Sequence, residues 1–223
     1  MREWFFFMKY IIIDIVTAIE LSQPYSRERL FKQNAMERLR KNIEEVTQVN
    51  DAEIEFINSF FLLKKVRRSQ FLVHEGDDVQ YEYMVLSGIY RIYYLDDDGK
   101  EHIVKFAQEN CWMSDYKAFF NRDRATMFIE CIEGGQVLCL TLYGREQLST
   151  ELHKMEQFFK VRLTKDYVAL EERVKVLLLN TARQRYDEFV KSHPGLMQRI
   201  PKKIIASYLG VCRETLSRIY LNC

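Results

Sequence analysis

PKKIIASYLGVCRETLSRI, residues 201–219, contains two short apolar runs on either side of one glycine. Ile205 and Leu209 lie four residues apart, as residues on one face of a helix do. Leu216 and Ile219 lie three apart and begin a second helical face. Gly210 separates the two runs, and a chain leaving a helix adopts positive φ at glycine without strain. The stretch therefore predicts two short helices joined by a tight turn, which is a helix-turn-helix.

The second of these helices carries polar side chains that are suited to reading DNA. The first helix is expected over about 202–209 and the second from about residue 212 or 213. A recognition helix presents its first residues to base edges in the major groove, where guanidinium groups bind guanine and carboxylates accept from cytosine. The candidate base contacts are Arg213, Glu214, Ser217 and Arg218, and the candidate phosphate contacts are Lys202, Lys203 and Thr215.

The local charge agrees with a DNA-binding end. Residues 199–223 hold five basic residues and one acid, a net charge of +4, whereas the whole chain has a net charge of +1. The basic charge therefore lies where phosphate would be met. Spacing and charge alone leave an alternative open, an ordinary helical hairpin whose charges are simply solvated.

The region before this end changes to period-two patterning. Residues 63–143 hold short apolar runs separated by turn residues, among them Asp96–Gly99, whose Asp-Gly pair is typical of a hairpin. Further turns are expected at Ser87-Gly88 and at residues 133–135. Such dense short strands predict a small antiparallel roll, which can enclose one small ligand.

Both regions resemble the Crp/Fnr family of bacterial transcription regulators. The segment RETLSRI at 213–219, after IASYLG at 205–210, is similar to that family's recognition helix and the helix before it. Upstream, EGD at 75–77 and YMVLSG at 83–88 are similar to the family's cyclic-nucleotide-binding roll. The resemblance covers about residues 40–223. It implies that Arg213, Glu214 and Arg218 contact the operator.

The ligand-binding part of the roll departs from that pattern. By the resemblance, cyclic AMP binders have a Gly-Glu pair for the ribose and an Arg-Ser or Arg-Thr pair for the phosphate. The corresponding positions here are Ser114-Asp115 and Arg124-Ala125, followed by Thr126. Asp115 is one methylene shorter than glutamate, and Ala125 has no hydroxyl. The candidate pocket is therefore Asp115, Arg124 and Thr126, and we expect it not to bind cyclic AMP.

No metal, cofactor or catalytic residue is expected. The five cysteines are scattered and none precedes Cys111, so the clustered ligands of an iron–sulfur site are missing. The four histidines are also isolated, and none forms the zinc-like spacing or the His-x-His pair of a metal-dependent enzyme of the cupin type.

A helical region over residues 147–193 links the roll to the DNA-binding end. Its apolar residues recur at coiled-coil spacing, and the candidate dimer residues are Phe159, Leu163, Tyr167, Leu170 and Val174. The alternative is that this helix packs on the roll. By the resemblance, it would pair with its twin in a homodimer, and a hinge near residues 170–176 would transmit ligand binding.

The domain division that follows has four parts. Residues 1–35 do not match the rest and are expected to be a poorly packed extension or the product of a misassigned start codon. Their apolar run, residues 4–19, is interrupted by Lys9 and Asp14, is shorter than a membrane-spanning helix, and lacks a cleavage site after it. The roll would span 36–146, the dimerisation helix 147–173, and the helix-turn-helix domain 174–223.

The chain is 48% hydrophobic over 223 residues, enough for one or two domains with a sizeable core. The predicted class is α+β, and the predicted function is a cytoplasmic, homodimeric regulator that binds double-stranded DNA and is not an enzyme. RNA polymerase and an unknown small-molecule effector are further candidate partners. The rival hypothesis is a ligand-binding β-roll protein whose helical tail only mediates assembly.

Overall fold

The computed structural model describes residues 24–221 of the chain. The chain divides into two units, residues 1–42 and 43–223, which are described separately. In the first unit the described residues form most of helix α2 (Pro24–Glu44). Residues 24–35 of the expected extension are therefore helical. The prediction made for residues 1–23 lies outside the described residues.

The second unit begins with helices, continues as a sheet and ends in helices. The unit begins at residue 43. Its helix α3 (Asp51–Asn58) is capped by Asn50. The Asn50 side chain accepts a hydrogen bond from Glu53 N, and the Glu53 carboxylate accepts one from Asn50 N. Asp51 is the first residue of α3. Phe61 begins the first strand.

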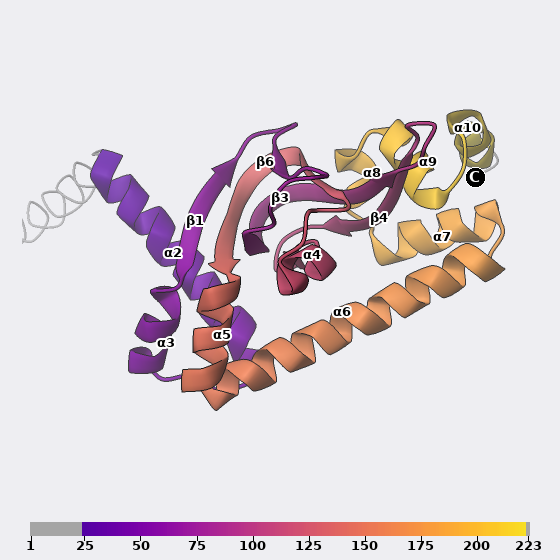
Figure 1. Cartoon of the computed structure of the whole chain (residues 1–223). Helices are drawn as coiled ribbons and strands as arrows, with labels where there is room; N and C mark the ends of the chain where they lie inside the picture. The colour runs from indigo at the N-terminus through magenta and orange to yellow at the C-terminus, as the bar shows by residue number, and fades with distance from the viewer. Residues whose placement is uncertain (1–23, 222–223) are drawn as a thin grey trace, which may run out of the picture. The chain divides into compact units, whose positions relative to one another are not determined.

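Six strands form one antiparallel sheet (Figure 1). They run in the order β1-β6-β3-β4, while β2 also pairs with β6 and β5 with β3. Their bounds are β1 Phe61–Val66, β2 Phe71–Val73, β3 Tyr81–Leu95, β4 Glu101–Ala107, β5 Trp112–Met113 and β6 Phe128–Thr141. A short helix, α4 (Tyr116–Asn121), lies between β5 and β6. The predicted antiparallel roll is therefore confirmed.

Two expected turns are bends inside long strands. Ser87-Gly88 lies within β3, and residues 133–135 lie within β6. Gly88 has φ +90°, and a Cβ on Gly135 would come within 1.9 Å of the Ser87 carbonyl oxygen. The pairing register of β3 and β6 shifts at this point. Glycines therefore allow two paired strands to bend together, and the roll closes without chain reversal there.

Two helices follow the sheet, and the second is long and continuous. They are α5 (Leu142–Glu151) and α6 (His153–Leu179), which extends 27 residues to a cap at Asn180. The expected hinge and domain boundary at about 170–176 lie inside α6. The helix actually breaks at Asn180 and Thr181, where Thr181 and Gln184 form a capping box for the next helix.

The last four helices form the C-terminal end and include the helix-turn-helix that the sequence predicts. They are α7 (Ala182–Ser192), α8 (Leu196–Arg199), α9 (Lys202–Leu209) and α10 (Arg213–Leu221). The α9 bounds match the prediction, and Gly210 ends α9 with φ +65°. His193 is the C-cap of α7, and its N–H donates to the Phe189 carbonyl.

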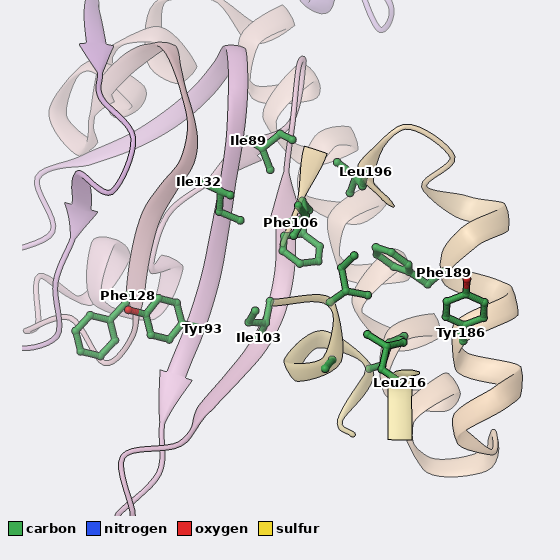
Figure 2. Packing of buried hydrophobic residues seen from close by; sticks show 14 residues of the cluster. Ile89, Tyr93, Ile103, Phe106, Phe128, Ile132, Tyr186, Phe189, Leu196 and Leu216 are labelled. Carbon is green, nitrogen blue, oxygen red and sulfur yellow. The ribbon is translucent and has the colours of Figure 1, made fainter. Parts of the chain in front are cut away.

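This end packs directly on strand β4 of the roll (Figure 2). Phe106 of β4 meets Phe189 of α7 with ring centroids 6.2 Å apart and Tyr208 of α9 at 4.9 Å. The Ser207 hydroxyl donates to the Glu101 carbonyl at 2.6 Å. A shared apolar core of roll and helix residues therefore fixes the position of α9.

Candidate nucleic-acid interface

Helix α10 is anchored by one buried side chain and presents its polar ones to solvent. Leu216 is 2% exposed and belongs to the same core as Ile205 and Leu209 of α9. The candidate base contacts on either side of it are all exposed: Arg213, Glu214, Ser217 and Arg218. These positions follow the helical period and so lie together on one face. The structure therefore brings the sequence-predicted base contacts to one accessible surface.

The charge of Glu214 is favoured at the start of α10. Hydrogen bonds from its own backbone N–H and from the Cys212 side chain, with Arg213 and Arg218 nearby, lower the pKa of this carboxyl. An anion at a helix N-terminus is also favoured by the helix dipole. Glu214 is therefore ionised at neutral pH, the form that accepts a hydrogen bond from a cytosine amino group.

The candidate phosphate contacts lie around the same helix. Lys202 and Lys203 are exposed at the start of α9. The Lys202 ammonium lies 4.3 Å from the centroid of the Tyr220 ring on α10. Thr215 is half-buried, and its Oγ1 lies 3.0 Å from Cys212 Sγ. Lys203 is thus the more freely presented of the two lysines, and the Thr215 hydroxyl is partly engaged.

One further basic residue adjoins this surface and was missed from the sequence. Arg183 of α7 lines a groove of about 360 Å³ together with Thr215, Arg218 and Ile219. Its Nε donates to Asp187, one helical turn along, at 3.1 Å. That spacing is typical of an ordinary surface pair, so the sequence carried no signal that Arg183 belongs beside α10.

The three candidate ligand residues of the roll do not form one site. Asp115 is fully buried and caps α4, because its carboxylate accepts from Ala118 N and from the backbone N–H and hydroxyl of Thr126. Arg124 instead pairs with Asp78 at 3.1 Å, with both side chains about 70% exposed. Asp115 and Thr126 therefore satisfy each other, and the guanidinium expected to hold a phosphate is at the surface.

A buried ionic cluster, which the sequence analysis missed, joins the roll to α6. Glu82 of β3 is fully buried and accepts from Arg145 Nη1 at 2.6 Å and from Arg162 Nη2 at 2.7 Å. Arg162 also donates to the Tyr116 hydroxyl at 2.9 Å and lies over the Trp112 ring. A lone carboxylate within the apolar run of residues 81–86 was the available signal, since buried charges need partners.

The predicted dimer residues divide into two groups. Tyr167, Leu170 and Val174 are exposed, by 61%, 47% and 47%. Leu163 is half-buried. Phe159 is only 2% exposed, packs against Trp112 and Phe158, and has Arg145 over its ring, so the structure corrects its assignment to the seam. The exposed apolar residues of α6 are Tyr167, Val168, Leu170, Val174, Leu177, Leu178 and Leu179.

Comparison with known proteins shows which regulators this chain is similar to. A family model described as the cyclic nucleotide-binding domain matches residues 63–149, nearly all of the roll and α5. The anaerobic regulatory protein of Pasteurella multocida (strain Pm70) is 23% identical over 184 residues, which cover 77% of this chain and 66% of that protein, slightly under two thirds. A solved Crp/Fnr-family transcriptional regulator from Eubacterium rectale matches with TM-score 0.63 at 15% identity, covering 77% of this chain and 82% of that one. The roll of this chain therefore matches the cyclic nucleotide-binding domain, and the chain is similar to regulators of the Crp/Fnr family.

The Crp/Fnr fold extends over most of the chain. The c-di-GMP-responsive global regulator CLP of Xanthomonas campestris has TM-score 0.65 at 15% identity, covering 78% of this chain and 91% of that one. At such identity the likeness shows the fold. The relatives are named as regulatory proteins rather than enzymes.

The described part of the chain has neither a metal-binding cluster nor a membrane-spanning helix. Between residues 24 and 221, no group of three or more His, Cys, Asp or Glu side chains is placed to hold a metal ion. Within the same described part, none of the helices combines the length and apolar character needed to cross a membrane.

Proposed function

We propose that this chain is a homodimeric transcription regulator that binds double-stranded DNA sequence-specifically through α10. The observation that carries the proposal is the exposed face formed by Arg213, Glu214, Ser217 and Arg218 on a helix anchored by Leu216. Two such helices, one from each protomer, would enter successive major grooves roughly 34 Å apart. The proposed function is thus recognition of a DNA sequence, and no catalytic step is proposed.

The second copy of the chain is proposed to bind the exposed apolar residues of α6. Tyr167, Leu170 and Val174 follow one another at spacings of three and four, the a/d pattern of a coiled coil. Leu178 continues the pattern and is 76% exposed. An apolar face of this kind on an exposed helix is favourable only when something covers it, and a two-fold partner presents the same face.

We also propose that the roll does not bind cyclic AMP and that DNA binding does not depend on it. The carboxylate of Asp115 is already saturated by α4 and Thr126, and Arg124 faces Asp78 at the surface. A buried phosphate without a guanidinium would lose its hydration without compensation. Titration calorimetry with cyclic AMP should give no heat at micromolar protein. A micromolar isotherm that Arg124→Ala abolishes would contradict this proposal.

The proposed place of action is the cytoplasm, where DNA and RNA polymerase, a further proposed partner, are found. The rival function, a ligand-binding roll whose helical tail only assembles the protein, predicts no DNA affinity. The exposed, charged face of α10 favours the DNA-binding function, because an assembly surface would instead present apolar side chains. The effector of the roll, if the protein uses one, is not specified by Asp115, Arg124 and Thr126.

The experiment is selection of bound DNA from a random pool, followed by affinity measurements on the selected site. Arg213→Ala should cost about 1–3 kcal/mol on that site and relax preference at one base pair, because a bidentate arginine reads a single base. Lys202→Ala should weaken selected and random DNA about equally, since it contacts phosphate. If Arg213→Ala leaves both affinities unchanged, α10 is not the recognition helix.

A further inference from the structure

A groove lies where the dimer helix meets the DNA-binding helices. It has a volume of about 510 Å³ and is lined by residues of α6, of α7 and of α9. Its charged lining residues are three bases, Arg173, Lys175 and Arg185, and two acids, Glu172 and Glu188. Lys175 already pairs with Glu172 at 3.2 Å. Arg173 and Arg185 are therefore the basic residues of the groove whose role needs an explanation.

These arginines differ from the arginines buried in the roll. Arg91 binds two carboxylates at 2.5 and 2.6 Å, and Arg145 and Arg162 share Glu82. In the described chain, neither Arg173 nor Arg185 forms an ion pair with an acid; both bind backbone carbonyls instead. Arg173 donates to the Tyr208 carbonyl and lies 3.7 Å over its ring. The groove thus holds half-buried positive charge without its usual partner.

Both guanidinium groups keep unused N–H donors. Arg185 Nε donates to the Leu209 carbonyl at 2.8 Å, and its Nη1 donates to the Asn180 carbonyl at 2.9 Å. The Nη2 of Arg185 has no acceptor among the described residues. The Nε of Arg173 is buried with no acceptor in the same part of the chain. Burial and the nearby Arg185 lower the pKa of Arg173. Such an arrangement costs free energy until an anion supplies the missing acceptors.

We propose that this groove binds a small organic phosphate through Arg173 and Arg185. Planar guanidinium groups match phosphate oxygens in bidentate geometry, and two of them suit a doubly charged group. The wall beside them is aromatic: Phe189 stacks on His193 at 5.1 Å and meets Tyr208 at 5.3 Å. The volume is in the range of small-molecule sites, so the phosphate would carry an organic, ring-containing part.

The groove remains accessible in the proposed dimer. Four of its α6 residues, Ala169, Glu172, Arg173 and Val176, lie at other helical positions than the exposed apolar residues Tyr167, Leu170, Val174 and Leu178. Only Lys175 of α6 lines both the groove and that apolar face. It is also separate from the roll, because none of its lining residues precedes α6. The site is therefore distinct from the dimer seam and from the Asp115 region.

Occupancy would act on the break between α6 and α7. Arg185 already spans it by donating to the Asn180 carbonyl, and Arg173 reaches from α6 to the carbonyl of Tyr208 on α9. A phosphate held by both arginines would tie α6, α7 and α9 to each other and fix α10 relative to the dimer helix. This effect on DNA rests on the proposed function, whereas binding of the phosphate does not.

The test is titration calorimetry on the full chain without DNA, using AMP as probe and adenosine as its uncharged match. AMP should bind with a dissociation constant of about 100 µM or tighter, and adenosine should show no binding. No heat with AMP at about 1 mM, or equal affinity for adenosine, would overturn the proposal. Failure of AMP to bind would leave selection of DNA by α10 unaffected, so the two proposals fail separately.

Three variants locate the site. Arg185→Gln should weaken AMP about tenfold or more, through loss of a charge-assisted contact. Glu188→Gln, an exposed change on the groove lining, should lower the dissociation constant of AMP about threefold, because it removes repulsion between the Glu188 carboxylate and the phosphate. This variant tests the site if Arg185→Gln does not fold. Arg124→Gln removes an equal charge from the roll and should bind AMP normally. If Arg124→Gln abolishes binding and Arg185→Gln does not, AMP binds the roll and the groove assignment is wrong.

Discussion

The two halves of α6 have similar apolar spacing and opposite environments. In the first half, Met155, Phe158 and Phe159 are at most 2% exposed and pack on the roll. In the second half, Leu178 and Leu179 are 76% and 74% exposed. Arg162 marks the change, because it is the last residue of the helix that is buried, through its bond to Glu82. One helix therefore serves the protomer's own core first and presents an unpaired apolar face afterwards.

This contrast shows what helical periodicity can and cannot predict. A period of three and four residues tells that one face of a helix is buried, but it does not tell by which partner. Phe159 and Tyr167 both belong to the apolar positions that the sequence assigns to one seam, and only Phe159 meets the roll, at Trp112. What separates them is the position of the Glu82 cluster, which depends on a residue 80 positions earlier than Arg162.

The largest expected effect is at the carboxylate that ends the buried half. Glu82→Ala should lower the free energy of unfolding by about 5 kcal/mol, because it leaves two buried arginines without their shared partner. Urea denaturation at low protein concentration measures this loss. Replacing Glu82, Arg145 and Arg162 together by methionine should recover most of the stability, since the uncompensated charges are gone. A loss below about 1 kcal/mol in Glu82→Ala would mean that the cluster does not hold α6.

A paired comparison between the two halves gives the next largest effects. Phe159→Ala should cost about 3 kcal/mol of unfolding free energy at any protein concentration, because it opens a cavity in the protomer's core. Leu178→Ala should leave the monomer's stability unchanged and weaken dimerisation about tenfold, because its side chain is covered only by the second copy. Denaturation and sedimentation equilibrium separate the two quantities. If Phe159→Ala affects dimerisation alone, the division of α6 is wrong.

The parts of the fold that sequence predicted well are those fixed by local rules. The bounds of α9 and the positive φ of Gly210 both depend on neighbours within a few residues. The end of α6 could not be predicted in the same way. The run at 174–179 is apolar on nearly every side, so it gave no sign of whether it continued one helix or began another.

The candidate site residues also divide into those that local rules predict and those that depend on distant partners. The candidate base contacts follow from the helical period once α10 is placed, and the structure shows them exposed. The fate of Asp115 depended on two distant partners, the start of α4 and Thr126, which no spacing rule identifies. Arg173 and Arg185 could not be predicted from the sequence either. What distinguishes them is that no carboxylate among the described residues pairs with them in the folded chain.

The smallest expected effect tests whether the C-terminal helices are held to the roll by their own contacts as well as through α6. Arg199 Nε and Nη2 donate to the Glu133 carboxylate, both at 2.9 Å, and lower the pKa of Glu133 below its ordinary value. Because the Glu133 side chain is 44% exposed, Glu133→Gln should cost only about 0.5 kcal/mol at pH 7.

The pH dependence gives this prediction its sign. A carboxyl whose pKa is lowered by folding contributes stability above its unfolded pKa and loses it as pH falls through the folded pKa. The difference between the unmodified chain and Glu133→Gln should therefore be full at pH 7 and should disappear on acidification below the ordinary carboxyl range. Glu146→Gln, an exposed acid at 3.9 Å from its partner Arg122, is the matched control and should show no such difference. If Glu133→Gln and Glu146→Gln behave alike at every pH, the Arg199 pair does not hold the C-terminal helices, and their position depends on α6, the apolar contacts of Phe106 and the Ser207 hydrogen bond to the Glu101 carbonyl.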